Sequence, residues 1–87
     1  MADLHLPSTL PPLFHELPRR LDVDAATVGE AIARLDERWP GMRDRLCEVG
    51  PVLRAHIHVY VDRERAGLDT ALGERSRIDV IAAISGG

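Results

Sequence analysis

TVGEAIARLDERW, residues 27–39, is the segment of this 87-residue chain that decides its fold. It opens with a capping box, in which the Thr27 hydroxyl accepts an amide hydrogen bond from the first helical turn and Glu30 reaches back. Pro40 and Gly41 then end the helix. The segment predicts one amphipathic helix, whose single apolar stripe consists of Val28, Ala31, Ile32, Leu35 and Trp39.

Four segments outside this helix alternate polar and apolar residues, which is the pattern of a strand with one buried face. They are Asp3–Leu6, Arg20–Asp24, Ala55–Asp62 and Arg77–Ile84. In the third segment the pattern turns Ile57, Val59 and Val61 inward and His56, His58 and Tyr60 outward.

Two connecting segments carry weaker signals. Met42–Glu48 is predicted as a short second helix, and residues 62–67 as a polar turn. The stretch between the first two strands is broken by prolines, and there we expect four apolar residues to fold back on the core: Leu10, Leu13, Phe14 and Leu17.

The predicted order is therefore strand, strand, helix, strand, strand. One helix with a long apolar stripe and strands with one inward face call for a sheet of four to five strands packed on one main helix. We predict an α+β fold in a single domain that spans residues 1–87.

Composition excludes several classes of protein. The net charge of −3 argues against a nucleic-acid partner, because phosphates demand a basic surface. No apolar run approaches the roughly 20 residues that cross a bilayer, and no signal peptide is evident. We therefore expect a cytoplasmic protein without a membrane partner.

Cysteine and lysine usage adds two observations. The single Cys47 fits a reducing compartment, and a small half-buried apolar residue is the favoured interpretation over a reactive thiol, whose role stays open. The chain has no lysine, so its side chains cannot receive an isopeptide bond. Any bond made by its own carboxylate would make this protein the donor, although codon bias explains the absence equally well.

Histidines invite a metal interpretation, because His56 and His58 are two apart on a predicted strand and His5 could share their face. Zinc requires three or four ligands, and no accompanying ligand motif is present. We therefore predict surface residues at a protein interface and no metal site.

Catalytic motifs are missing from the sequence. We find no nucleophile elbow, no glycine-rich phosphate loop and no paired carboxylates in a defined pocket. We therefore expect that the protein is not an enzyme and binds no cofactor of its own.

The chemistry instead points to the last four residues, Ile84-Ser85-Gly86-Gly87. Glycine has no Cβ, so a Gly-Gly tail can lie extended in a channel too narrow for other residues. A carboxylate becomes a good electrophile once it is converted to an acyl adenylate, and a sulfur nucleophile can then displace AMP. The sequence predicts a carboxylate that other proteins activate.

The chain resembles the MoaD/ThiS group of sulfur carriers, which are ubiquitin-like proteins with a β-grasp fold. The resemblance covers nearly the whole chain. The matching segments are the opening strand, Asp24–Leu46, His56–Asp62, Gly67–Leu72 and Ile78–Gly87. The opening LPSTLPP looks closer to the CysO-like carriers of cysteine synthesis than to the small subunits of molybdopterin synthase. Thiamin, molybdopterin and sulfur-containing natural products are the other pathways that such a carrier could serve.

This resemblance implies roles for individual residues. Gly87 would be adenylated by a ubiquitin-activating-type adenylyltransferase and sulfurtransferase that uses ATP, and then carried as a thiocarboxylate to a sulfur-acceptor enzyme. Gly86 would complete the tail motif, and Ser85 and Ile84 would occupy a groove of the partner. In the family the outer sheet face near the tail contacts partners. The resemblance therefore implies a partner surface that consists of His56, His58, Tyr60 and Ile81.

The sequence departs from the family pattern in two turns. Asp62–Arg65 stands where the family has an Asn-Gly-type turn, and Gly73–Arg77 replaces an Asp-Gly-Asp turn. Neither segment touches the tail, so the departures bear on loop geometry and on which acceptor is used.

Two other functions stay open. The activated tail could instead be attached to amines of target proteins, which predicts conjugates that vanish when Gly87 is removed. A noncovalent ubiquitin-like interaction module would keep every partner after Gly86 and Gly87 are removed.

Overall fold

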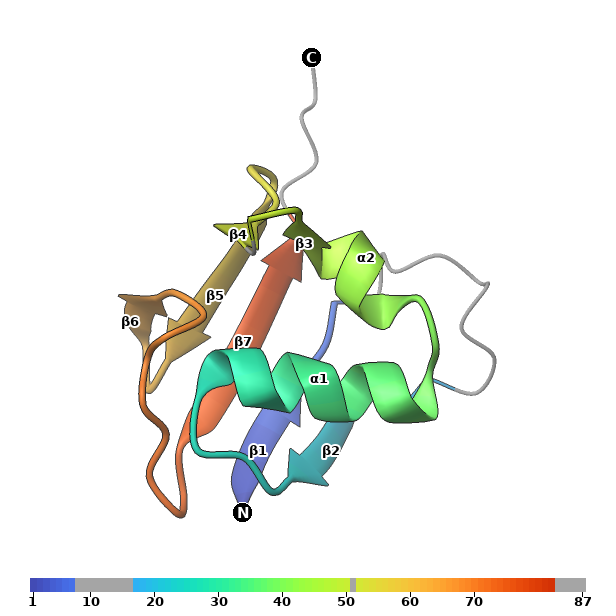
Figure 1. Cartoon of the computed structure of the whole chain (residues 1–87). Coiled ribbons are helices and arrows are strands. Elements are labelled where there is room, and N and C mark those ends of the chain that lie inside the picture. Colours follow the sequence, from blue (N-terminus) through green and yellow to red (C-terminus); the bar gives the residue numbers. More distant parts are fainter. Residues whose placement is uncertain (8–16, 51, 83–87) are drawn as a thin grey trace.

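The predicted amphipathic helix is α1, Val28–Arg38, and it lies across one face of a five-stranded sheet (Figure 1). The computed structural model describes residues 1–7, 17–50 and 52–82. No helix in these ranges is long and apolar enough to span a membrane.

The sheet is mixed and has the strand order β2-β1-β7-β5-β6. β1 and β7 run parallel, and every other neighbouring pair is antiparallel. All four predicted strands are present, so the α+β prediction is confirmed. The strand bounds are Ala2–His5 for β1, Arg20–Val23 for β2, Ile57–Val61 for β5, Glu64–Ala66 for β6 and Arg77–Ala82 for β7.

Three short strands were not predicted. β6 lies inside the segment predicted as a polar turn, where it pairs with β5 behind a two-residue turn. The helix predicted to reach Glu48 is α2, Met42–Leu46, and the residues after it form β3, Cys47–Glu48. β3 pairs with β4, Val52–Leu53, in a separate two-stranded sheet.

The core lies between α1 and the inner sheet face. All four buried residues of α1 come from the predicted apolar stripe, and Trp39, its fifth member, packs against the core in partial exposure. Full burial of one such side chain stabilises the fold by roughly 1.5–3 kcal/mol. The largest fully buried side chains are Leu4, Val28, Leu35, Met42, Leu46, Val59 and Ile78.

Half of the predicted capping box is present at the start of α1. The Thr27 Oγ1 atom accepts from the Glu30 backbone N–H at 3.1 Å. The Glu30 carboxylate lies 3.8 Å from the Arg34 guanidinium, one turn further along the helix, and no bond from it to Thr27 is found in the described ranges. One of the free N–H groups of the first turn is therefore satisfied by the cap.

The segment Gly67–Leu72 satisfies further N–H groups at this helix end. The backbone N–H groups of Val28 and Gly29 donate to the Thr70 and Leu68 carbonyls at 3.1 and 2.8 Å. A Cβ at Gly29 would lie 3.2 Å from the Leu68 oxygen, so glycine permits this close approach. The helix is thereby fixed to the loop that leads into β7.

The expected return of the proline-rich stretch to the core can be followed only in part. Leu17 packs against the core. The other three residues, Leu10, Leu13 and Phe14, lie outside the described residues.

Candidate functional site

The four predicted tail residues, Ile84, Ser85, Gly86 and Gly87, lie outside the described residues. What the structure describes is the tail root, which we define as Ile81 and Ala82 at the end of β7. Five residues follow Ala82 in the sequence, and an extended chain of that length spans at most roughly 18 Å.

β7 is the central strand of the sheet, and the tail root lies at its end. β1 pairs with β7 in parallel at Arg77–Asp79, and β5 pairs with it at Ile78–Ala82. Within that pairing Ala82 lies opposite Ile57 and Ile81 lies opposite His58. The tail root is therefore paired with β5 on one side, whereas β1 pairs only with the earlier residues of β7.

Three of the four predicted partner-surface residues meet on the outer sheet face, away from α1. Ile81 is 47% exposed and pairs with His58, while Tyr60 lies two residues further along β5, opposite Asp79. The fourth, His56, is exposed in the turn before β5, because the strand begins at Ile57 rather than at the predicted Ala55. It therefore borders the sheet face instead of extending it.

One row of side chains crosses the outer face through all five strands. The strand registers place Arg20, His5, Asp79, Tyr60 and Arg65 opposite one another in that order. At the far edge the Arg65 guanidinium carbon lies 6.0 Å from the centre of the Tyr60 ring, a cation–π distance.

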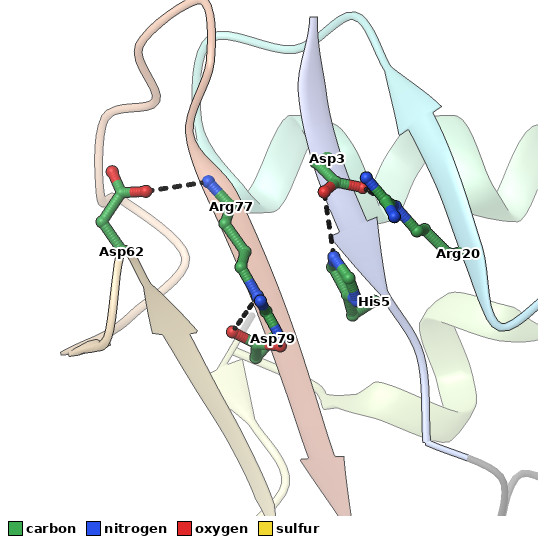
Figure 2. A network of polar contacts seen from close by, with 6 residues as sticks. All are labelled: Asp3, His5, Arg20, Asp62, Arg77 and Asp79. Atoms are coloured by element: carbon green, nitrogen blue, oxygen red, sulfur yellow. Dashed lines mark hydrogen bonds and ion pairs between the residues drawn. The ribbon is translucent and has the colours of Figure 1, made fainter.

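This row and the one beside it carry an ion-pair network that sequence analysis missed (Figure 2). Asp3 accepts from Arg20 at 2.9 Å and lies 3.0 Å from His5 Nε2, while Arg77 binds Asp79 at 3.0 Å. Hydrogen bonds from Arg20 and then from His5 hold the pKa of Asp3 below its ordinary value of 3.8. The signal that could have found the network is the acid or base at every second residue of two strands, Asp3-Leu4-His5 and Arg77-Ile78-Asp79.

The outer face therefore has two zones. The ion-pair network lies away from the tail root, and Ile81 and His58 lie at it. The histidines do not converge, because β7 separates His5 on β1 from His58 on β5. Among the described residues no group of three His, Cys, Asp or Glu could hold a metal ion.

Cys47 is 7% exposed and belongs to the core cluster, as the interpretation of a small apolar residue predicts. Burial raises the pKa of its thiol, and the positive charges of Arg43 and Arg54 oppose this only in part. A buried neutral thiol is a poor nucleophile.

A sheet that wraps one main helix, with a parallel pair at its centre, defines a ubiquitin-like β-grasp domain. The solved structures that resemble it include a chain of the BexX/CysO complex from Amycolatopsis orientalis, with a TM-score of 0.87, 24% identity and full coverage of both chains. CysO from Mycobacterium tuberculosis matches with a TM-score of 0.83 and 22% identity, over 97% of this chain and 100% of that one. Small archaeal modifier protein 1 from Haloferax volcanii matches with a TM-score of 0.76 and 29% identity, over 99% and 98% of the two chains.

The family follows from the sequence. The model of the ThiS family matches residues 13–87, so the chain belongs to that family. A search of curated proteins finds no match.

Proposed function

We propose that this protein is a sulfur carrier whose Gly87 carboxylate is adenylated, converted to a thiocarboxylate and used to donate sulfur to a biosynthetic enzyme. The observation that carries the proposal is the family match, which extends through the Gly-Gly to residue 87. The resemblance to CysO over the whole fold supports it.

The proposed chemistry is balanced in two steps. A Gly87 carboxylate oxygen attacks the α-phosphorus of ATP on an activating enzyme, and pyrophosphate leaves. A hydrosulfide-type nucleophile then attacks the acyl carbon, AMP leaves, and a thiocarboxylate remains. The acceptor enzyme takes the sulfur from it, so the chain acts as a co-substrate and ATP is used only by its partner.

The described residues would contribute presentation rather than chemistry. The central strand β7 would carry the tail from a root that is paired with β5, and Ile81, His58, Tyr60 and His56 would bind the partner beside it. The BexX/CysO complex shows that a CysO protein forms a complex with a second protein, which supports such an interaction here. We place this chemistry in the reducing cytoplasm, in keeping with the free thiol of Cys47.

Intact-mass spectrometry tests the proposal. The chain is incubated with ATP, a ubiquitin-activating-type enzyme and a sulfur source, and the expected product carries one sulfur in place of one oxygen. The matched control lacks Gly87 and should gain no sulfur. Sulfur gain by the shortened chain, or none by the full chain with several activating enzymes, would contradict the proposal.

Covalent modification of other proteins is the second candidate, and the similarity to small archaeal modifier protein 1 favours it. The same adenylated tail would then be captured by a target amine, with AMP as the leaving group. Higher-mass conjugates in cell extracts that disappear on deletion of Gly87 would support this function, and their absence would favour carriage.

A further inference from the structure

Exposed apolar side chains gather at one end of the molecule. Among the described residues four large apolar side chains are exposed: Met1, Val49, Val52 and Ile81. Ile81 belongs to the tail root, and the two valines lie in the β3–β4 hairpin, which sits at the same end of the sheet (Figure 1). Single exposed apolar residues are ordinary, but two on one short hairpin at the end of the sheet that carries the tail root suggest a contact with another protein.

We define the hairpin tip as Val49, Gly50 and Val52. Val49 is 103% exposed and Val52 is 51% exposed, so neither contributes much to the core. Turns favour glycine, asparagine, aspartate and serine, because these residues suit turn geometry and water. A bare valine there is not explained by the stability of the hairpin.

The hairpin tip has a rigid support. Cys47 pairs with Leu53, and both pack in or against the core beneath the tip. Two hydrogen bonds from Arg54 connect the end of β4 to α2. Its backbone N–H donates to the Leu46 carbonyl at 2.9 Å, and its Nε donates to the Asp44 carbonyl at 2.8 Å. The valines are therefore presented in a fixed place, which reduces the entropy lost on binding.

Charges of both signs border the hairpin tip, since Asp69 lines the same surface depression as Gly50 and Val52. Arg54 lies 3.9 Å from Glu48, so these two charges offset each other. On α2 Arg43 and Arg45 are exposed, and Asp44 is the one acidic residue of this helix. Neither arginine has an ion pair within the described ranges. A complementary partner would offer an apolar recess with charges of both signs at its rim.

The position of the tail root indicates which protein the hairpin tip would contact. Only five residues follow Ala82, so a protein that takes the Gly87 carboxylate into its active site must approach this end of the domain. We propose that the hairpin tip is a second docking element, which inserts Val49 and Val52 into an apolar recess of the ATP-dependent activating enzyme. This inference rests on the proposed sulfur-carrier function.

ATP–pyrophosphate exchange tests the inference, with several purified ubiquitin-activating-type enzymes that are each assayed first with the wild-type chain. The Val49→Ser/Val52→Ser variant should raise the KM for the carrier about tenfold or more and leave kcat unchanged, because burial of one valine contributes roughly tenfold in affinity. The matched control is Arg63→Ser/Glu64→Ser, which changes one turn residue and the first residue of β6 at the other end of β5, and it should leave KM unchanged. Val49→Thr/Val52→Thr, which keeps the branched shape, replaces the serine variant if thermal unfolding shows that the latter is not folded.

The outcomes separate the two proposals. A variant KM within twofold of wild type overturns the docking inference and leaves the sulfur-carrier function standing. An unchanged KM together with lost self-association in sedimentation would assign the hairpin tip to a second copy of the chain, which also overturns it. Absence of exchange with the wild-type chain overturns the sulfur-carrier function, and this inference with it.

Discussion

The two ends of the sheet carry hairpins of opposite character. The turn between β5 and β6 is polar, and its Asp62 is bonded to Arg77 in both directions, by its N–H at 2.9 Å and by its carboxylate at 2.9 Å. The β3–β4 hairpin, beside the tail root, exposes Val49 and Val52. The difference indicates that one end is built to stabilise the fold, while the other leaves apolar surface for a partner.

The largest expected effect on stability is at the buried support of the β3–β4 hairpin, and the hairpin tip should show almost none. Leu46, directly before β3, is fully buried, so Leu46→Ala should lower the free energy of unfolding by about 2–5 kcal/mol. Val49→Ala should change it by less than about 0.5 kcal/mol, because the side chain is already in water. Urea unfolding of the two variants measures both values, and a large loss for Val49→Ala would show that the tip is structural.

A smaller effect is expected at the polar hairpin. Asp62 and Arg63 have φ angles of 51° and 73°, the left-handed conformation of a type I′ turn. Asp62→Ala loses the hydrogen bond to the Arg77 N–H and a residue that tolerates this conformation, so we expect a loss of about 1–3 kcal/mol.

Asp62→Asn is the matched control for this position. Asparagine keeps both the acceptor oxygen and the tolerance of positive φ, so it should retain most of the stability. Chemical unfolding in which alanine and asparagine are equally tolerated would mean that the turn does not depend on this side chain.

The smallest effect concerns the ion pairs of the polar zone and their pH dependence. Because the pKa of Asp3 is lowered in the folded state, its contribution is present above the unfolded value of 3.8 and is lost as pH falls through the folded pKa. The wild type should therefore lose thermal stability more steeply than Asp3→Asn below about pH 4. The control is Asp69→Asn, at an exposed residue without an ion pair in the described part of the chain, and it should follow the wild-type curve. Identical curves for all three proteins would show that Asp3 does not contribute to the pH dependence of stability.

Local patterns predicted the elements that local interactions determine. The cap and apolar stripe of α1 are encoded within thirteen residues, and alternation within each strand identified the inward faces of β1, β2, β5 and β7. The short strands escaped prediction because two or three residues carry too little periodicity. Glu64-Arg65-Ala66 becomes β6 only because β5 lies beside it.

The site was predictable to a smaller extent. His58, Tyr60 and Ile81 were placed on one face, because alternation fixes which face of a strand a residue occupies. The ion pairs between β1 and β2, and the row through β7, depend on strand register, which one sequence does not reveal. The exposure of Val49 was equally hidden, since a β-branched residue between Glu48 and Gly50 gives no sign of facing water.

The most direct test of the central claim locates the sulfur within the chain. Since the sequence has no lysine, trypsin cuts only after arginine and releases the tail as one peptide, Ile78–Gly87, separate from the Cys47 peptide Leu46–Arg54. After incubation with ATP, an activating enzyme and a sulfur source, the account predicts one oxygen exchanged for sulfur in Ile78–Gly87, with fragment ions placing it on Gly87. Sulfur added to the Cys47 peptide while Ile78–Gly87 keeps its original mass would contradict it.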